Sequence, residues 1–171
     1  NTKTRLIVLI NPNNPTGTSV SLKQIEDLLK SFPDIPLLVD EAYYEFTGET
    51  CVSLLSKYPN LILVRTFSKA LALPSLRLGY IIASREFILE IQKIRGPYDV
   101  NSVAVLAARE QLNLPEHWQK TVRHLMDESK PAIEKYFDEK QVRYFSSKAN
   151  FMLVGPPDVQ DACKFLMENK I

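Results

Sequence analysis

The sequence predicts an α/β protein with a mostly parallel sheet. Up to about residue 95, short apolar runs typical of buried strands alternate with segments of helical periodicity, the pattern of a sheet with helices on its faces. Hydrophobic residues make up 45% and charged residues 24% of the 171 residues, as in a soluble globular protein. We expect residues 1–115 to form part of a large three-layer domain, and residues 116–171 to hold a connecting helix and the start of a smaller α+β C-terminal domain.

The first helix begins at Ser21, and Gln24 completes a capping box with it. Its buried stripe is expected to comprise Ile25, Leu28, Leu29 and Phe32. The other elements of the first domain are strands at 5–10, 37–39, 61–64 and 79–83, a short helix at 52–57, and a helix capped by Ser84 that runs to about Ile94.

The remainder of the chain is mainly helical. A helix rich in alanine and valine is predicted at 102–112, and a long helix from Pro115 to about Phe137, which Pro131 should kink or break. Two short strands at 141–145 and 150–154 follow, and Asp158 caps a final helix.

Composition excludes several classes of function. The net charge of +1, with both signs interspersed, gives no electrostatic basis for binding nucleic acid or an anionic membrane. No apolar run is long enough to span a bilayer, and no signal peptide opens the sequence. Cys51 and Cys163 lack the spacing of metal ligands and favour a reducing compartment, the cytoplasm. Both ends of the sequence run through predicted elements, so we expect an internal piece of a longer protein.

A polar segment, residues 65–79, follows the strand at 61–64 and is the first candidate site. Ligands of open α/β sheets bind at the carboxyl ends of the strands. A lysine in that position, Lys69, can lose its hydration and attack a carbonyl. Thr66, Ser68 and Arg77 can converge on a phosphate. An amine beside an anion site suggests pyridoxal phosphate held as a Schiff base. The alternative is that Lys69 and Arg77 are surface charges between two strands.

Two other strand ends carry polar groups suited to the same ring. A buried Asp40 would keep the ring nitrogen protonated, so that the ring acts as an electron sink. Asn14 and Tyr43 are donors for the phenolic oxygen of the ring. Taken singly, Asp40 is more often a strand-end cap, Asn14 a turn residue and Tyr43 a packing residue.

The remaining ionisable candidates have simpler readings. Glu41 and Glu45 are interpreted as structural or solvated charges, and His117 and His124 as surface groups on a helix.

Three motifs identify a resemblance. Asn-Pro-Asn-Asn-Pro-Thr-Gly at 11–17, Val-Asp-Glu-Ala-Tyr at 39–43 and Arg-Thr-Phe-Ser-Lys at 65–69, followed by Arg77, resemble the fold-type I pyridoxal-phosphate-dependent aminotransferases of classes I and II. Within that group the chain is most similar to histidinol-phosphate aminotransferases, which also resemble it at 97–102 and 147–151. The resemblance implies the PLP-dependent transferase-like fold.

The resemblance also implies roles for individual residues. Lys69 is the Schiff-base lysine, Asp40 pairs with the pyridine nitrogen, and Asn14 and Tyr43 bind the phenolic oxygen, so that Lys69, Asp40 and Tyr43 are the expected catalytic residues. The cofactor phosphate is held by Thr66, Ser68 and Arg77. A cis bond between Asn14 and Pro15 is implied as well.

The same resemblance implies a homodimer and places parts of the active site outside this sequence. An upstream phosphate loop, a stacking aromatic residue and a tyrosine from the partner subunit are expected before Asn1, and a substrate-binding arginine after Ile171. For these 171 residues alone we therefore expect no turnover.

The implied activity is amino transfer between glutamate and imidazole acetol phosphate, in histidine biosynthesis. No metal is required. Alternatives with the same motifs are an aminotransferase for aromatic or other amino acids and a threonine-phosphate decarboxylase. A non-catalytic PLP-binding domain of a regulator is a further alternative.

Overall fold

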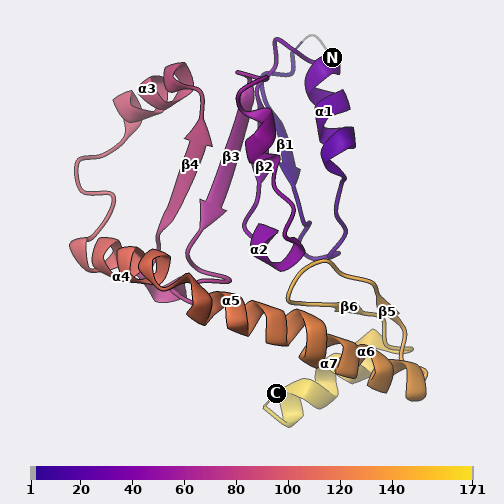
Figure 1. Cartoon of the computed structure of the whole chain (residues 1–171). Helices are drawn as coiled ribbons and strands as arrows, with labels where there is room; N and C mark the ends of the chain where they lie inside the picture. Colours follow the sequence, from indigo (N-terminus) through magenta and orange to yellow (C-terminus); the bar gives the residue numbers. More distant parts are fainter. Residues whose placement is uncertain (1–2, 171) are drawn as a thin grey trace.

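The computed structural model describes residues 3–170, whose centre is a four-stranded sheet. The strands β1 (Ile7–Ile10), β2 (Leu37–Asp40), β3 (Leu61–Thr66) and β4 (Gly79–Ala83) lie side by side in that order (Figure 1). The first three are parallel, and β4 runs antiparallel to β3. The predicted α/β class with a mostly parallel sheet is confirmed, and β1, β2 and β3 end at one edge of it.

Helix α1 (Leu22–Ser31) crosses from β1 to β2 and begins at the predicted capping box. The Ser21 hydroxyl accepts from the Gln24 N–H, and the Gln24 side chain accepts from the Ser21 N–H. Ile25 and Leu29 are buried against the sheet, and Leu28 packs beside them. Phe32 was wrongly predicted to be buried: it is 42% exposed because it lies one residue past the helix, where the backbone has left helical geometry.

We predict that Ser21→Ala lowers the free energy of unfolding by about 1 kcal/mol, because the first turn loses its side-chain acceptor. Chemical denaturation monitored by far-UV circular dichroism measures the effect. Ser53→Ala is the control, since Ser53 is exposed and makes no side-chain hydrogen bond among the described residues; its effect should stay within about 0.5 kcal/mol.

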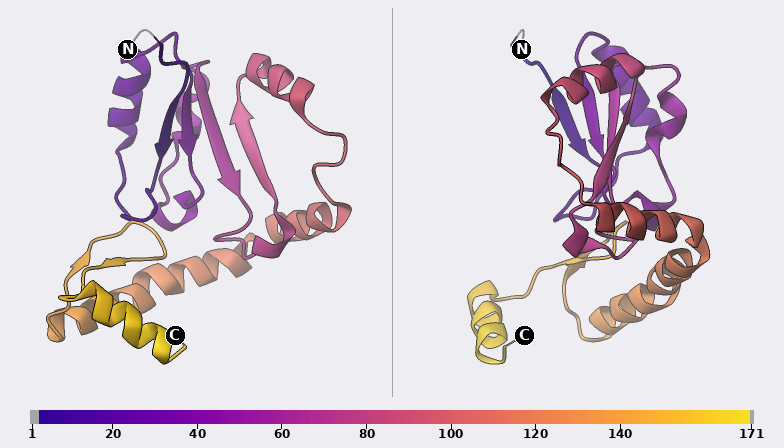
Figure 2. Two further views of the ribbon diagram at one scale, coloured as in Figure 1. Left: turned by 180° about the vertical axis from the view of Figure 1, so that it is seen from behind. Right: turned by 90° about the vertical axis from the view of Figure 1, so that its left-hand side faces the viewer.

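The two faces of the sheet differ. On one, α1 and the 3₁₀ turn η1 (Cys51–Leu54) cover a core that includes Leu37, Val39, Leu61 and Leu63. The predicted helix at 52–57 is this shorter turn. On the opposite face the described residues leave Val8, Ile10 and Ile81 exposed. The right-hand view of Figure 2 shows the covering segments on one side of the strands.

Beyond the sheet, α2 (Tyr44–Thr47) follows β2, and α3 (Arg85–Ile94) follows β4 after the predicted Ser84 cap. Helix α4 (Ser102–Asn113) confirms the predicted helix at 102–112. It leads into a long rod below the sheet (Figure 1).

The rod comprises α5 (Pro115–His124), the π turn η3 (Leu125–Ser129) and α6 (Lys130–Glu139). Pro131 was predicted to kink or break the helix: the chain does not break, but the helix is distorted into a π turn directly before the proline. A proline lacks an N–H donor, and the widened π turn, in which the Lys130 N–H bonds to the Leu125 carbonyl, accommodates it with the helix continuing. His117 and His124 lie exposed on this rod, as predicted.

The last elements are β5 (Tyr144–Phe145), β6 (Leu153–Val154) and α7 (Val159–Glu168), which Asp158 caps as predicted. The two strands are shorter than predicted. At the start of the first, the Gln141 and Val142 N–H groups donate back to the Asp138 and Phe137 carbonyls at the end of α6 and so do not join the ladder. Throughout residues 3–170, no helix has both the length and the apolar character needed to cross a bilayer.

Candidate functional site

An open pocket of about 430 Å³ lies at the carboxyl edge of the sheet. One side consists of residues that follow the strands, and the other consists of the loop between β5 and β6. The lining residues are Asn14, Pro15, Tyr43, Lys69, Asn150, Phe151, Met152 and Leu153. The pocket therefore lies where residues 14–69 meet residues 150–153.

The loop after β1 presents Asn14 to the pocket. Backbone hydrogen bonds from Asn13 to the Thr18 carbonyl and from Gly17 to the Asn13 carbonyl close it tightly. The Asn14–Pro15 bond is cis, as the resemblance implied, and the Asn11–Pro12 bond is also cis. The exposed Asn14 amide donates to the Tyr43 hydroxyl over 3.0 Å.

Tyr43 is buried, and its ring forms the floor beneath Lys69. The Lys69 amine lies 5.2 Å from the centroid of that ring. Because the Tyr43 oxygen accepts the bond from Asn14, its own proton remains free for a further acceptor. The structure thus brings together Asn14, Tyr43 and Lys69, three of the seven predicted site residues.

Lys69 itself is exposed, which corrects the expectation that it would be desolvated. The reason is geometric, since the pocket is open on one side in the described part of the chain. Its amine makes no hydrogen bond or ion pair within residues 3–170, and its contact there is with the Tyr43 ring. A ligand that fills the pocket can reach it directly.

Asp40 ends β2, aligned with Ile10 of β1 and Val64 of β3. It is half-buried rather than buried, and one carboxylate oxygen accepts the Ala42 N–H over 2.9 Å. The other oxygen makes no hydrogen bond in the described residues. Asp40 does not itself line the pocket, although it lies at the same sheet edge, three residues before Tyr43.

The predicted phosphate ligands lie at the end of β3. The Thr66 hydroxyl donates to the Leu78 carbonyl and accepts from the Ser68 N–H, over 3.3 and 3.1 Å. Arg77 returns beside Thr66 because β4 pairs with β3, and its guanidinium donates to the Pro74 carbonyl over 2.9 Å. Arg77 is exposed, and none of these three side chains lines the pocket.

Two features escaped sequence reasoning. Asn150 and Phe151 complete the pocket, and no periodicity marks them. Glu41, interpreted as structural or solvated, is a buried partner of Arg65, to which no role was assigned. A signal for this pair exists, because Arg65 alternates with Leu61 and Leu63 on the covered face of β3.

Glu45, the other carboxylate without a predicted function, is half-buried beside this pair. One of its oxygens is buried without a hydrogen-bond partner in the described chain. Burial raises its pKa to about 7, the Glu41 carboxylate adds to the effect, and a backbone hydrogen bond and Arg65 oppose it.

We predict that this carboxyl makes folding stability fall with rising pH. Since the folded pKa lies above the unfolded value, the stabilisation is complete below about pH 4.5 and is lost as the pH rises through about 7. The loss is about 1–2 kcal/mol after allowance for partial exposure. Thermal unfolding of the wild type and Glu45→Gln between pH 4.5 and 8 checks it; parallel curves for the two proteins would contradict it.

Residues 1–170 match the family model described as aminotransferase class I and II. Histidinol-phosphate aminotransferase 2 of Hydrogenovibrio crunogenus is 38% identical over 176 residues, which is 99% of this chain and 47% of that protein. The chain spans about half the length of the curated relatives it matches.

Solved structures of similar fold support the same family assignment. Histidinol-phosphate aminotransferase from Sinorhizobium meliloti, in complex with pyridoxal-5'-phosphate, superposes with a TM-score of 0.85 at 26% identity, covering 96% of this chain and 46% of that one. L-threonine-O-3-phosphate decarboxylase from Porphyromonas gingivalis gives a TM-score of 0.83 at 28% identity, covering 96% of this chain and 52% of that one. The predicted PLP-dependent transferase-like fold is confirmed.

Proposed function

Because this chain belongs to the class I and II aminotransferases, we propose that it is part of a pyridoxal-phosphate-dependent histidinol-phosphate:2-oxoglutarate aminotransferase. The proposal is based on one structural observation: Lys69, Tyr43 and Asn14 line the same pocket. The substrate rests on the curated relatives, several of which bear this name at 36–42% identity.

The pocket fits the cofactor on two counts. Its volume of about 430 Å³ lies in the range of small-molecule sites. Its polar groups are also of the required kinds: a primary amine, a phenol with a free proton, and a carboxamide. When bound, pyridoxal phosphate supplies an electron sink for carbanion chemistry.

Each residue then has a defined task. The Lys69 amine would hold the cofactor through its aldehyde group, and the free amine would move a proton at the substrate carbon. Tyr43 and Asn14 hold the phenolic oxygen, and Asp40 keeps the ring nitrogen protonated. The hydroxyls of Thr66 and Ser68 and the Arg77 guanidinium would hold the phosphate. At present the Thr66 hydroxyl donates to the Leu78 carbonyl and the guanidinium donates to the Pro74 carbonyl.

Further parts of the proposal concern the whole protein. We propose a cytoplasmic homodimer acting on small amino and keto acids, without nucleic-acid or membrane partners. Residues 1–115 belong to its cofactor-binding domain and residues 116–171 to the connecting helix and the smaller domain.

The test of the site is chemical trapping. The full-length protein is loaded with pyridoxal phosphate, reduced with borohydride, digested and mapped by mass spectrometry. The label is expected on Lys69. A label on another lysine, for example Lys148, two residues before the pocket residue Asn150, would refute the assignment.

A second candidate is a threonine-phosphate decarboxylase, favoured by the similarity to the Porphyromonas gingivalis enzyme. Both substrates are phosphorylated amino compounds, so the same pocket can serve either. Assay of the full-length protein with histidinol phosphate, threonine phosphate and aromatic amino acids decides among the candidates, including the aromatic aminotransferases. Cofactor binding without turnover of any of these substrates would favour the non-catalytic PLP-binding domain of a regulator.

A further inference from the structure

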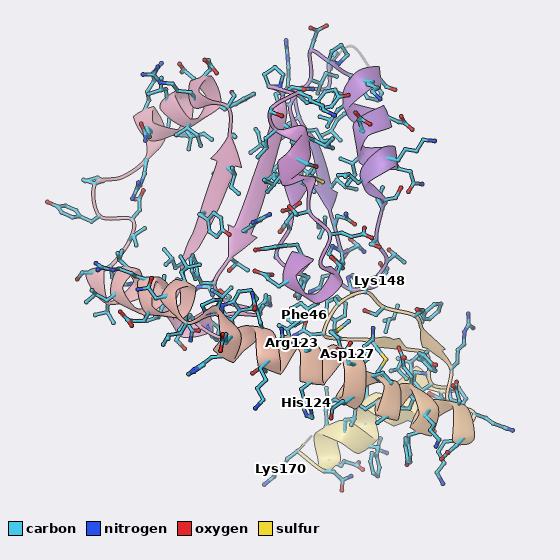
Figure 3. All side chains as sticks on the ribbon, viewed as in Figure 1. Phe46, Arg123, His124, Asp127, Lys148 and Lys170 are labelled. Atoms are coloured by element: carbon cyan, nitrogen blue, oxygen red, sulfur yellow. The ribbon has the colours of Figure 1, made fainter. Side chains whose placement is uncertain are left out.

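The loop between β5 and β6 docks tightly on the loop that carries Asn14. The Lys148 N–H donates to the Gly17 carbonyl over 2.7 Å, and the flanking residues Ser147 and Ala149 are buried. Figure 3 labels Lys148 where this loop meets the lower end of the sheet. We call residues 147–151 the docking segment.

Both sides of the junction are shaped for this contact. Gly17 has a φ of +73°, and a Cβ there would collide with the Ser147 side chain and lie 2.8 Å from its Cα. From α6, the Lys130 amine donates to the Ser147 carbonyl. The Ser147 hydroxyl accepts the Ala149 N–H over 3.0 Å. The docking segment is thus held against Gly17 on one side and by the amine of Lys130 on the other.

The end of the docking segment brings Phe151 onto Tyr43. The two rings meet edge to face, with centroids 5.1 Å apart and an interplanar angle of 76°. Phe46 contacts the Tyr43 ring as well, at 6.3 Å. The ring that carries the Tyr43 hydroxyl, which accepts from Asn14, is therefore held by contacts with both Phe46 and Phe151.

We propose that Phe151 is a positioning residue that acts through Tyr43, and that the docking segment holds it in place. The inference rests on the proposed function, in which Tyr43 and Asn14 hold the phenolic oxygen of the cofactor. Hydrogen bonds to that oxygen favour its deprotonated form. Loosening of the Tyr43 ring should therefore raise the pH at which the bound cofactor changes its absorption.

The experiment is a pH titration of the cofactor absorption band in the full-length holoenzyme. Phe151→Ala is expected to raise the midpoint by about one pH unit, the order expected for loss of one hydrogen bond. Tyr43→Phe should give a similar rise, and the double variant little more than either, because both act on the same hydroxyl. Phe145→Ala, an exposed aromatic of the same domain outside the pocket, should leave the midpoint unchanged.

A second variant keeps the test independent of Phe151 itself. Gly17→Ala displaces the docking segment while leaving both rings intact, and should raise the midpoint in the same direction. The positioning role is wrong if neither Phe151→Ala nor Gly17→Ala changes the midpoint. It is also wrong if the double variant of Phe151→Ala and Tyr43→Phe shifts the midpoint by the full sum of the two single shifts. A wild-type protein without a cofactor band instead overturns the proposed function, and the positioning role with it.

Discussion

Lys69→Ala should abolish amino transfer by the full-length enzyme, with kcat reduced by at least about 10⁴-fold. The lysine is the only amine lining the described pocket, so under the proposed function both the covalent attachment of the cofactor and the proton transfer would depend on it. Steady-state assays with histidinol phosphate and 2-oxoglutarate measure the loss. The variant should still fold, because Lys69 is exposed and makes no hydrogen bond in the described chain.

Two comparisons sharpen this result. Lys69→Arg keeps the positive charge above the Tyr43 ring but offers no nucleophilic amine, so it should be as inactive as the alanine variant. Lys57→Ala removes an exposed lysine outside the pocket and should retain full activity. Activity of Lys69→Ala within tenfold of the wild type would rule out the proposed role.

The sequence was informative wherever a local pattern determines the structure. Helix caps depend on residues only three positions apart, and both the capping box at Ser21 and the cap at Asp158 were predicted correctly. The strands of the main sheet follow from short apolar runs and were also predicted. The candidate site could also be placed, because parallel strands end at one edge and bring Asn14 to within hydrogen-bonding distance of Tyr43.

What could not be predicted depends on contacts between distant segments. Phe151 reaches Tyr43 only because the rod below the sheet returns the chain to the loop at Gly17, and no local pattern in the sequence encodes that path. Pro131 was expected to kink or break the rod, and the sequence did not show which: a single π turn before the proline accommodates it and the helix continues. The open pocket, and with it the exposure of Lys69, likewise follows from which segments cover the sheet edge.

The buried pair of Glu41 and Arg65 should give the largest loss of stability. One Glu41 oxygen lies 2.9 Å from Arg65 Nε and 2.8 Å from Nη2, and the other accepts the Cys51 N–H over 2.6 Å. Both residues are buried, with 2% and 8% of their surfaces exposed. Glu41→Ala therefore leaves a buried guanidinium without its counter-ion and a buried N–H without its acceptor, at a cost of about 3–5 kcal/mol.

Denaturant unfolding of Glu41→Ala measures this cost, and Glu90→Ala is the matched control, because the Glu90–Lys93 pair is exposed and should contribute less than about 0.5 kcal/mol. Replacing both partners, as in Glu41→Met with Arg65→Met, should cost less than the sum of the single changes, since no charge is left unpaired. A loss below about 1 kcal/mol for Glu41→Ala would show that the pair contributes little to the stability of the fold.

The pair joins the ends of two strands: Glu41 directly follows Asp40, and Arg65 directly precedes Thr66. Under the proposed function, loss of the pair should therefore weaken cofactor binding as well as folding, because the same contact fixes the strand ends after which the proposed cofactor ligands Asp40 and Lys69 lie.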